Sequence, residues 1–338
     1  MNVVDLTLKL CRISSISGDE AEVSRVVAHL LSELGFCVEK QQVGDVVGRD
    51  NIFAYAPNSK PEILLTTHID TVGPFIEPYF SDDKAVLLGR GVCDAKGIAA
   101  AMICAAKQLL LKGETRVGLL FVVGEETVSD GAKTARENFA PKVRYFINGE
   151  PTDLKLVTHM KGAMVFDLET KGTAGHSAYP ETGFSAVHQL CEDLNKLLKY
   201  EWPSNPESGH TTLNIGTIQG GVAGNVIAPH AEARCVMRLT QDVSSVEKQV
   251  KSLLHENTDV HVHTCISPVQ LHTVEGFETC SVSFGSDVPH LKSLGVPLLI
   301  GPGSILDAHT SHEKILVKEL EASVEIYQKL CGKLLETS

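Results

Sequence analysis

Acidic and histidine side chains spread over most of the chain have the chemistry of a hydrolytic site built on two metal ions. Each of them follows a strand-like apolar run or lies in a Gly-rich or polar turn, and an α/β sheet places its ligands at such strand ends. Imidazole and carboxylate groups without thiolates suit catalytic Zn, Co or Mn better than a structural zinc site. The set consists of His68, Asp70, Asp94, Glu125, Glu126, Glu150 and His309.

The spacing within this set suggests different roles for its members. His68 and Asp70 lie two residues apart at a strand end and point to one face, so Asp70 could orient an imidazole that binds metal. Asp94 stands in the Gly-rich run GRGVCDAKG, and its two oxygens could bridge cations about 3.5 to 4 Å apart. Glu125 and Glu126 directly follow the apolar run VGLLFVV and point in different directions, so one could bind metal while the other acts as general base.

No single motif carries this interpretation. A lone His-x-Asp at a strand end is more often a histidine beside a turn acid than a catalytic pair. Several acids at one sheet edge, however, would repel one another at considerable cost, and cations relieve that repulsion. The combination therefore indicates catalysis with metal, although spacing does not say which of Glu125 and Glu126 is the base.

Hydrophobic periodicity predicts the elements that position these residues. Helical spacing from Val3 to Leu34, interrupted by a polar turn at Ser14 to Gly18, predicts two helices. Strand-like runs and an Ala-rich helix then alternate, which predicts an α/β domain with a doubly wound mixed sheet. The expected strands are 37–41, 51–55, 62–69 and 116–123, and the expected helix is 97–112.

After Glu150 the pattern changes, and it predicts a two-layer, ferredoxin-like α+β domain inserted into the first. Its expected strands are 165–171, 213–216 and 231–239, and its expected helices are 183–199 and 244–256. A buried strand at 296–300 and a last helix at 316–335 then return to the sheet domain, and His309 belongs to this return. We therefore expect a discontinuous metal-binding domain, residues 1–160 and 265–338, and an inserted domain, residues 161–264.

Composition excludes several functional classes. A net charge of -12 without clustered Lys and Arg argues against nucleic-acid binding. No stretch approaches the roughly 20 apolar residues that span a bilayer, so we expect a soluble, cytoplasmic protein with no membrane partner. The nine cysteines include no CxxC pair and are expected to be reduced, buried thiols. GRGVCDAKG lacks the third glycine of a dinucleotide fingerprint, so a dinucleotide-binding site is not expected. With these classes excluded, a small molecule or a peptide is the expected partner.

Seven segments together resemble a family of co-catalytic zinc hydrolases that includes acetylornithine deacetylase, succinyl-diaminopimelate desuccinylase, carboxypeptidase G and the aminoacylases. The segments, in order, are LTTHIDTV, GRGVCDAKGIAAAM, VVGEETVSDGA, NGEPTDL, KGTAGHSAYP, GGVAGNVIAP and GPGSILDAHTSHE. The resemblance implies two divalent cations, with zinc expected first and cobalt or manganese as alternatives. It implies that one cation is held by His68, Asp94 and Glu150, and the other by Asp94, Glu126 and His309. It also implies that Glu125 is the base.

The same resemblance implies that the inserted domain is a lid through which the protein forms a homodimer. His176 would then hydrogen-bond the developing oxyanion, often from the partner subunit, although a turn histidine is the alternative. Asn225 and Arg238 match positions that contact substrate, and an ordinary surface salt bridge is the alternative for Arg238. The turn at Gly301 to Ser304 could present the N–H groups of Gly301 and Gly303 to a substrate carboxylate.

Other histidines and loop residues receive structural interpretations. His261 and His263 have strand-face spacing without an acid placed beside them in the sequence, so an exposed strand is expected. His312 stands where relatives often carry Asp or Asn, which could alter the surroundings of His309. Lys96 and Asp130 are expected to shape loops.

The expected reaction is hydrolysis of an amide, in which Glu125 deprotonates water and then protonates the departing amine. The NGEPTD segment and the compact length favour an N-acetyl or N-succinyl amino acid such as N-acetylornithine, and hence a role in arginine biosynthesis. A dipeptidase or carboxypeptidase with the same metal chemistry is the alternative. An alternative from another functional class is a binding module that kept the fold but has no catalytic activity.

Overall fold

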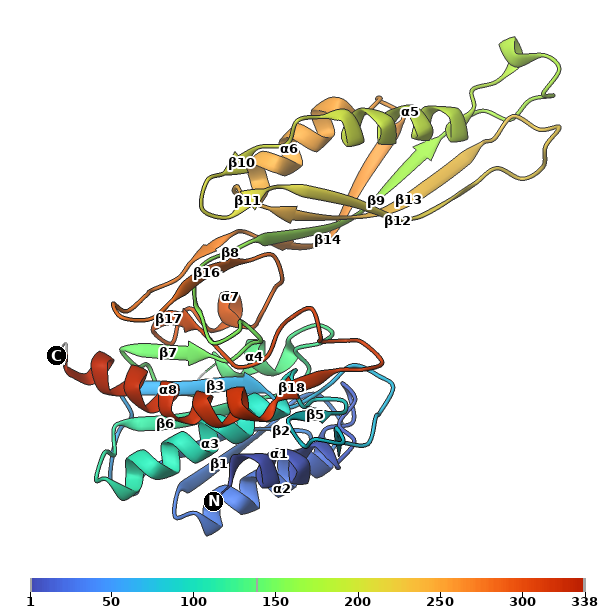
Figure 1. Cartoon of the computed structure of the whole chain (residues 1–338). Helices are drawn as coiled ribbons and strands as arrows, with labels where there is room; N and C mark the ends of the chain where they lie inside the picture. Colours follow the sequence, from blue (N-terminus) through green and yellow to red (C-terminus); the bar gives the residue numbers. More distant parts are fainter. Residues whose placement is uncertain (1, 138, 337–338) are drawn as a thin grey trace. The chain divides into compact units, whose positions relative to one another are not determined.

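The computed structural model describes residues 2–137 and 139–336, which form two compact units (Figure 1). The first unit contains the chain up to Thr158, Leu271–Cys280, and the chain from Ser286 onward. The second unit contains His159–Gln270 and Ser281–Gly285. The chain therefore returns to the first unit later than the expected boundary at residues 264 and 265.

Strand pairing explains this later return. Strand β14 (Thr258–Ile266) extends past residue 264, and β15 (Val269–Gln270) then pairs with β8 (Leu156–Met160). Together with β16 (Thr279–Val282), these last two strands form a three-stranded sheet where the chain passes between the units.

The main sheet of the first unit has six strands in the order β1-β2-β6-β3-β7-β17. The run from β6 to β17 is parallel, whereas β1–β2 and β2–β6 pair antiparallel, which confirms the expected mixed α/β sheet. In sheet order the strands are Cys37–Gln42, Asp50–Tyr55, Val117–Val122, Ile63–His68, Tyr145–Asn148 and Val296–Leu299.

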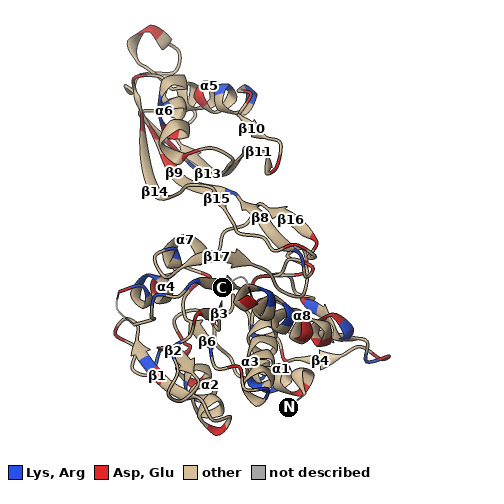
Figure 2. Ribbon diagram, turned by 90° about the vertical axis from the view of Figure 1, so that its left-hand side faces the viewer, with Lys and Arg blue, Asp and Glu red and all other residues tan. Residues whose placement is uncertain are grey.

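Helices cover both faces of this sheet. On one side α1 (Val3–Cys11), α3 (Lys96–Leu111) and α8 (Val317–Glu336) pack on one another, and α4 (Asp130–Ala135) lies on the other (Figure 2). Helix α2 (Ala21–Glu33) packs on β1 and β2, and the short α7 (Val288–Leu291) packs on α4. Every residue of β3 and β6 is buried because apolar neighbours lie on both faces.

A small sheet brings two distant parts of the sequence together. Strand β5 (Val86–Leu88) pairs antiparallel with β18 (Lys314–Leu316) and with β4 (Tyr79–Phe80). Strand β5 ends just before the GRGVCD loop, and β18 begins directly after Glu313. The pairing therefore places Glu313 beside that loop, and the Gly89 N–H donates to the Glu313 carbonyl at 3.0 Å.

The second unit is an antiparallel sheet in the order β12-β13-β9-β14, with two helices on one face. Residues of β9 (Gly162–Lys171) alternate between buried and half-buried, which is typical of a sheet with one covered face. The other elements are β12 (Thr212–Gly220), β13 (His230–Leu239), α5 (Ala186–Lys199) and α6 (Val243–Leu253), with a 3-10 turn at Pro180–Thr182 and a hairpin of β10 (Ser204–Asn205) and β11 (Gly209–His210). The expected α+β architecture is confirmed.

The cysteines partly depart from expectation. All nine are free thiols, and most are buried, but Cys191 and Cys265 are exposed. Cys265 lies on β14, an edge strand of its sheet, near the end of that strand. Within the described ranges, none of the helices is both long and apolar enough to traverse a bilayer.

Candidate active site

The predicted ligands gather at one edge of the main sheet. His68 ends β3, Glu125 and Glu126 follow β6, Glu150 follows β7, and His309 lies in the loop after β17. These four strands are parallel, so their carboxyl ends meet at the same edge. The main ligand set therefore comes from the first unit alone.

Asp94 lies between two histidines that approach different oxygens of its carboxylate. His68 Nε2 lies 3.0 Å from Asp94 Oδ1, and His309 Nε2 lies 3.4 Å from Asp94 Oδ2. His309 Nε2 also lies 2.9 Å from Glu126 Oε1. One ligand atom each from His68, Asp94 and Glu126 falls within 4.8 Å of the others, a spacing that a cation can occupy. Imidazole and carboxylate donors of this kind fit divalent cations.

Glu150 adds a buried carboxylate to this group. It is 4% exposed, and the Asn148 side-chain amide donates to its Oε1 at 3.3 Å. Burial raises the pKa of Glu150 well above its usual value, the charge of His68 opposes this shift, and the charge of Asp94 adds to it. A nearby cation would favour the ionised carboxylate instead.

The neighbouring carboxylates raise the pKa values of both histidines. Hydrogen bonds that His309 donates to the Asp94 and Glu126 carboxylates raise the pKa of His309 to about 10. Burial opposes protonation of His68, but Asp70 and Asp94 outweigh it and raise its pKa well above the usual value. Burial likewise works against ionisation of Asp94, yet His309 and His68 hold the pKa of that carboxyl below its usual range. The site is thus built to hold positive charge.

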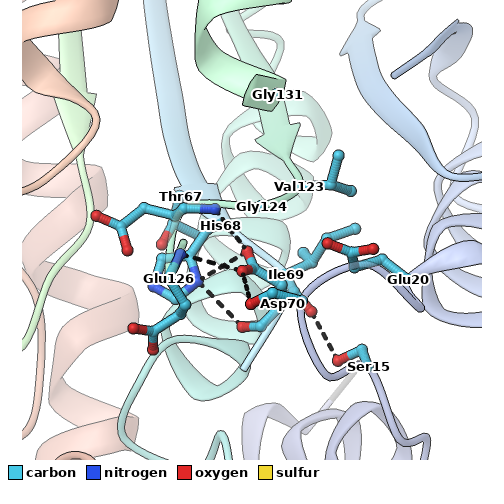
Figure 3. A network of polar contacts seen from close by, with 12 residues as sticks. Ser15, Glu20, Thr67, His68, Ile69, Asp70, Val123, Gly124, Glu126 and Gly131 are labelled. Atoms are coloured by element: carbon cyan, nitrogen blue, oxygen red, sulfur yellow. Dashed lines mark hydrogen bonds and ion pairs between the residues drawn. The ribbon is translucent and has the colours of Figure 1, made fainter. Parts of the chain in front are cut away.

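Asp70 does more than orient His68 (Figure 3). His68 Nδ1 lies 3.0 Å from the Asp70 carbonyl oxygen and 3.4 Å from Asp70 Oδ1. The Asp70 carboxylate also accepts the backbone N–H groups of Glu125, at 3.2 Å, and Glu126, at 3.1 Å. One buried carboxylate therefore fixes both a predicted ligand and the backbone of the two glutamates. No motif in the sequence indicated this second role.

Glu125, the predicted base, has a carboxyl whose pKa depends on burial and on the surrounding acids. Burial raises the pKa of Glu125 well above its usual value, and the charge of Glu150 adds to the shift. A carboxylate with a raised pKa is a better proton acceptor near neutral pH. Glu126, its neighbour, contacts His309, so the two glutamates have the separate environments expected of a metal ligand and a base.

Glu313 supports Asp94 and was missed by sequence reasoning. Its carboxylate accepts the backbone N–H groups of Gly91, Cys93 and Asp94 at 2.9, 3.0 and 3.1 Å, and Arg90 Nη1 donates to it at 2.7 Å. The signal in the sequence that could have identified Glu313 is its position at the end of the DAHTSHE segment.

His312 does not have the expected effect on the surroundings of His309. It is exposed, and its Nδ1 lies 3.3 Å from the Ser311 hydroxyl. The next residue, Glu313, is buried. The support in this loop therefore comes from Glu313.

A second buried carboxyl near this group was also missed. Asp287, just before α7, is 1% exposed, and its Oδ1 has no hydrogen-bond partner in the part of the chain that the structure describes. Burial raises the pKa of Asp287 to about 7, while the charge of His68 opposes the shift. No motif pointed to this residue.

His176 and Asn225 lie together in the second unit. They occupy adjacent exposed loops, where His176 bridges to Val226 and the Ser177 N–H donates to the Asn225 carbonyl at 3.0 Å. Arg238 instead lies near the far end of β13 and is half-buried. No carboxylate forms an ion pair with it among residues 2–137 and 139–336, so the salt-bridge alternative has no partner there.

The predicted role of Gly301 and Gly303 is wrong. The Gly301 N–H donates to the Thr152 hydroxyl at 3.0 Å, and the Gly303 N–H donates to Glu319 Oε1 at 2.7 Å. Both glycines are buried. Because these donors already have partners within the chain, the turn offers neither of them to a substrate carboxylate.

The remaining residues have structural contacts. Lys96 Nζ donates to the Ile13 carbonyl at 2.6 Å, and Asp130 forms two bonds with Arg49, so both connect loops. Acids do accompany His261 and His263, because β9 presents Glu169 at 3.2 Å and Asp167 at 2.8 Å to them. Cross-strand register, which the sequence does not reveal, produces these exposed pairs.

Comparisons with known proteins point to one family. Residues 64–333 match the model of peptidase family M20/M25/M40. A protein of Aspergillus terreus named probable carboxypeptidase is 40% identical over 363 residues, covering 95% of this chain and 84% of the relative. Aminopeptidase PepT of Bacillus cereus has a similar fold, with a TM-score of 0.81, 21% identity, and coverage of 97% of this chain and 96% of PepT. A Bacillus subtilis protein described as a dinuclear metal binding peptidase from the M20 family gives a TM-score of 0.74, 16% identity, and coverage of 99% and 98%.

Proposed function

Because the chain belongs to peptidase family M20/M25/M40, we propose that it is a metal-dependent peptidase that acts on short peptides as a carboxypeptidase or dipeptidase. The name of the Aspergillus terreus relative favours this alternative over the removal of an acyl group from N-acetylornithine. Neither deacetylation nor arginine biosynthesis receives support from the comparisons. The reaction remains hydrolysis of an amide bond.

The observation that carries this proposal is the position of Asp94 between His68 and His309, with Glu125 nearby in the same cluster. We propose that His68, Asp94 and Glu150 hold one divalent cation, and that Asp94, Glu126 and His309 hold a second. Zinc is the first expectation, with cobalt and manganese as alternatives. Bound there, the cations would polarise the scissile carbonyl and lower the pKa of water to about 7.

The protein's own residues would then move the proton. Glu125 would take it from the attacking water and deliver it to the amine that leaves. Asp70 would keep His68 in one orientation and hold the Glu125 backbone in place. His176 would donate to the oxyanion of the tetrahedral intermediate, and Asn225 and Arg238 would contact the substrate. Arg238, which pairs with no carboxylate among the described residues, suits a substrate carboxylate.

The positions of these last residues support a homodimer. The loop with Asn225 precedes β13, which begins at His230. Arg238 lies eight residues farther along that strand, and eight residues span roughly 26 Å at the usual rise per residue. A short peptide cannot bridge that distance. We therefore propose that His176 and Asn225 serve the site of a second copy, with the inserted unit forming the interface.

A substrate panel tests the proposed function. The metal-loaded protein is offered dipeptides and tripeptides with free or amidated C-termini, together with N-acetylornithine and N-succinyl-diaminopimelate. We expect release of the C-terminal residue from the free peptides, slower cleavage of the amidated ones, and loss of activity with a chelator. Cleavage of the N-acyl amino acids alone would restore the deacylase interpretation. Bound metal without any turnover would favour a non-catalytic binding module.

A further inference from the structure

The polar turn between the first two helices lies against the residues that follow β3. The Ser15 hydroxyl donates to the Ile69 carbonyl at 2.9 Å (Figure 3), and the Thr71 N–H donates to the Ser15 carbonyl at 2.9 Å. The Ser17 N–H donates in turn to the Thr71 carbonyl at 3.2 Å. This turn, which the expected functions did not involve, is therefore fixed beside Asp70.

One side chain of the turn reaches the carboxylate of Asp70. The Ser17 hydroxyl donates to Asp70 Oδ2 at 2.7 Å, and the same oxygen accepts the Glu126 N–H at 3.1 Å. The other oxygen accepts the Glu125 N–H at 3.2 Å and lies 3.4 Å from His68 Nδ1. Because Asp70 is fully buried, these partners together determine its orientation.

We propose that Ser17 is a positioning residue that fixes Asp70 and, through it, both His68 and the backbone of Glu125 and Glu126. Its expected effect on turnover rests on the proposed function. Its expected effect on cation binding rests only on the contact between Asp70 and His68. Groups that orient a metal ligand through a hydrogen bond typically change metal affinity or activity by about 10-fold to 100-fold.

The turn has anchors that do not depend on Ser17. Glu20 is fully buried, and its carboxylate accepts hydrogen bonds from the Arg49 guanidinium at 2.7 and 3.2 Å. Arg49 also donates to the Asp130 carboxylate at 2.7 and 2.9 Å. Lys96 holds the start of the turn through the Ile13 carbonyl. Removal of the Ser17 hydroxyl therefore changes the support of Asp70 while the path of the backbone stays in place.

The test compares matched variants of the full chain. Ser17→Thr and Ser17→Val introduce side chains of similar shape, in which a methyl group of Val replaces the hydroxyl of Thr, and Ser17 itself is half-exposed. Ser15→Ala removes a hydroxyl from the same turn that contacts a backbone carbonyl rather than Asp70. Each variant is measured for thermal midpoint, for kcat and KM, and for Mn²⁺ affinity of the metal-stripped protein by calorimetry.

We expect Ser17→Val to lower kcat about 10-fold to 100-fold with KM within about threefold, and to weaken Mn²⁺ binding about 10-fold or more. Ser17→Thr should restore most of both quantities, and Ser15→Ala should keep both within about threefold of the parent while lowering the thermal midpoint. Equal behaviour of Ser17→Val and Ser17→Thr in both readouts would overturn the proposal. If the parent protein cleaves no peptide, the proposed function fails, and Mn²⁺ affinity alone still decides the role of Ser17.

Discussion

His309 Nε2 lies 3.4 Å from Asp94 Oδ2, the oxygen that His68 does not approach. Because one carboxylate faces both histidines with separate oxygens, its loss should disturb both cation positions, whereas loss of either histidine should disturb one. This asymmetry distinguishes a bridging carboxylate from an ordinary terminal ligand.

Metal content should follow that asymmetry. After dialysis we expect about two cations per chain in the parent, about one in His309→Ala, and close to none in Asp94→Ala. His312→Ala is the matched control, since its exposed imidazole belongs to the same loop, and it should retain about two. The measurement is elemental analysis against protein concentration. Equal metal content in Asp94→Ala and His309→Ala would refute the bridge.

Glu125→Gln should separate chemistry from metal binding. The amide cannot accept the proton, so kcat should fall about 10²-fold to 10⁴-fold while the cations remain bound. Steady-state kinetics and elemental analysis of one preparation provide both quantities. Glu22→Gln, an exposed change on α2, should leave kcat unaltered. Near-normal turnover of metal-loaded Glu125→Gln would show that another group is the base.

Cation binding should release protons at neutral pH. With a pKa of about 10, His309 of the metal-free protein is protonated at pH 7, and a ligating imidazole must be neutral. Apparent affinity should therefore rise with pH up to about 10, because protons compete less. Calorimetry at pH 7 in buffers of different ionisation enthalpy measures the release. His309→Ala should release about one proton fewer, and an unchanged release would contradict the assignment.

Much of the architecture could be predicted because its signals are local. Buried runs such as Leu119–Val123 and the Ala-rich α3 alternate along the chain, and that alternation predicts parallel strands whose ends meet. The meeting of His68, Glu126 and His309 follows the same logic, since a residue after each parallel strand reaches one edge. These features need no knowledge of how distant segments pair.

Features that depend on distant pairing could not be predicted. Glu313 reaches the Asp94 loop only because β18 pairs with β5, and nothing in either segment specifies that partner. The N–H groups of Gly301 and Gly303 looked available because Thr152 and Glu319 lie elsewhere in the sequence. The identity of the substrate could not be predicted for a related reason. The metal ligands specify the reaction, but they do not specify the groups that enclose the peptide.

Glu313→Gln should strongly destabilise the protein. Glu313 and Arg90 are 1% and 2% exposed, and removal of one charge leaves the other buried without its counterion, at a cost of about 3–5 kcal/mol. Urea unfolding of the metal-free protein provides the free energy. Glu247→Gln interrupts the exposed pair with Lys251 and should cost less than about 1 kcal/mol. A similar cost for both variants would contradict the structural role of Glu313.

Gly303→Ala should disturb the Asp94 loop through Cys93. Gly303 has a φ of +86°, and an added Cβ would lie 2.5 Å from Cys93 Sγ. Gly113 has the same φ with open space around it, so Gly113→Ala should show the backbone cost alone, about 1–2 kcal/mol. Gly303→Ala should cost about 1–3 kcal/mol more because of overpacking. Adding Cys93→Ala removes the opposing sulfur, so the double variant should be more stable than the two single costs predict. Additive costs in urea unfolding would show that the sulfur contact is not what excludes a side chain at this position.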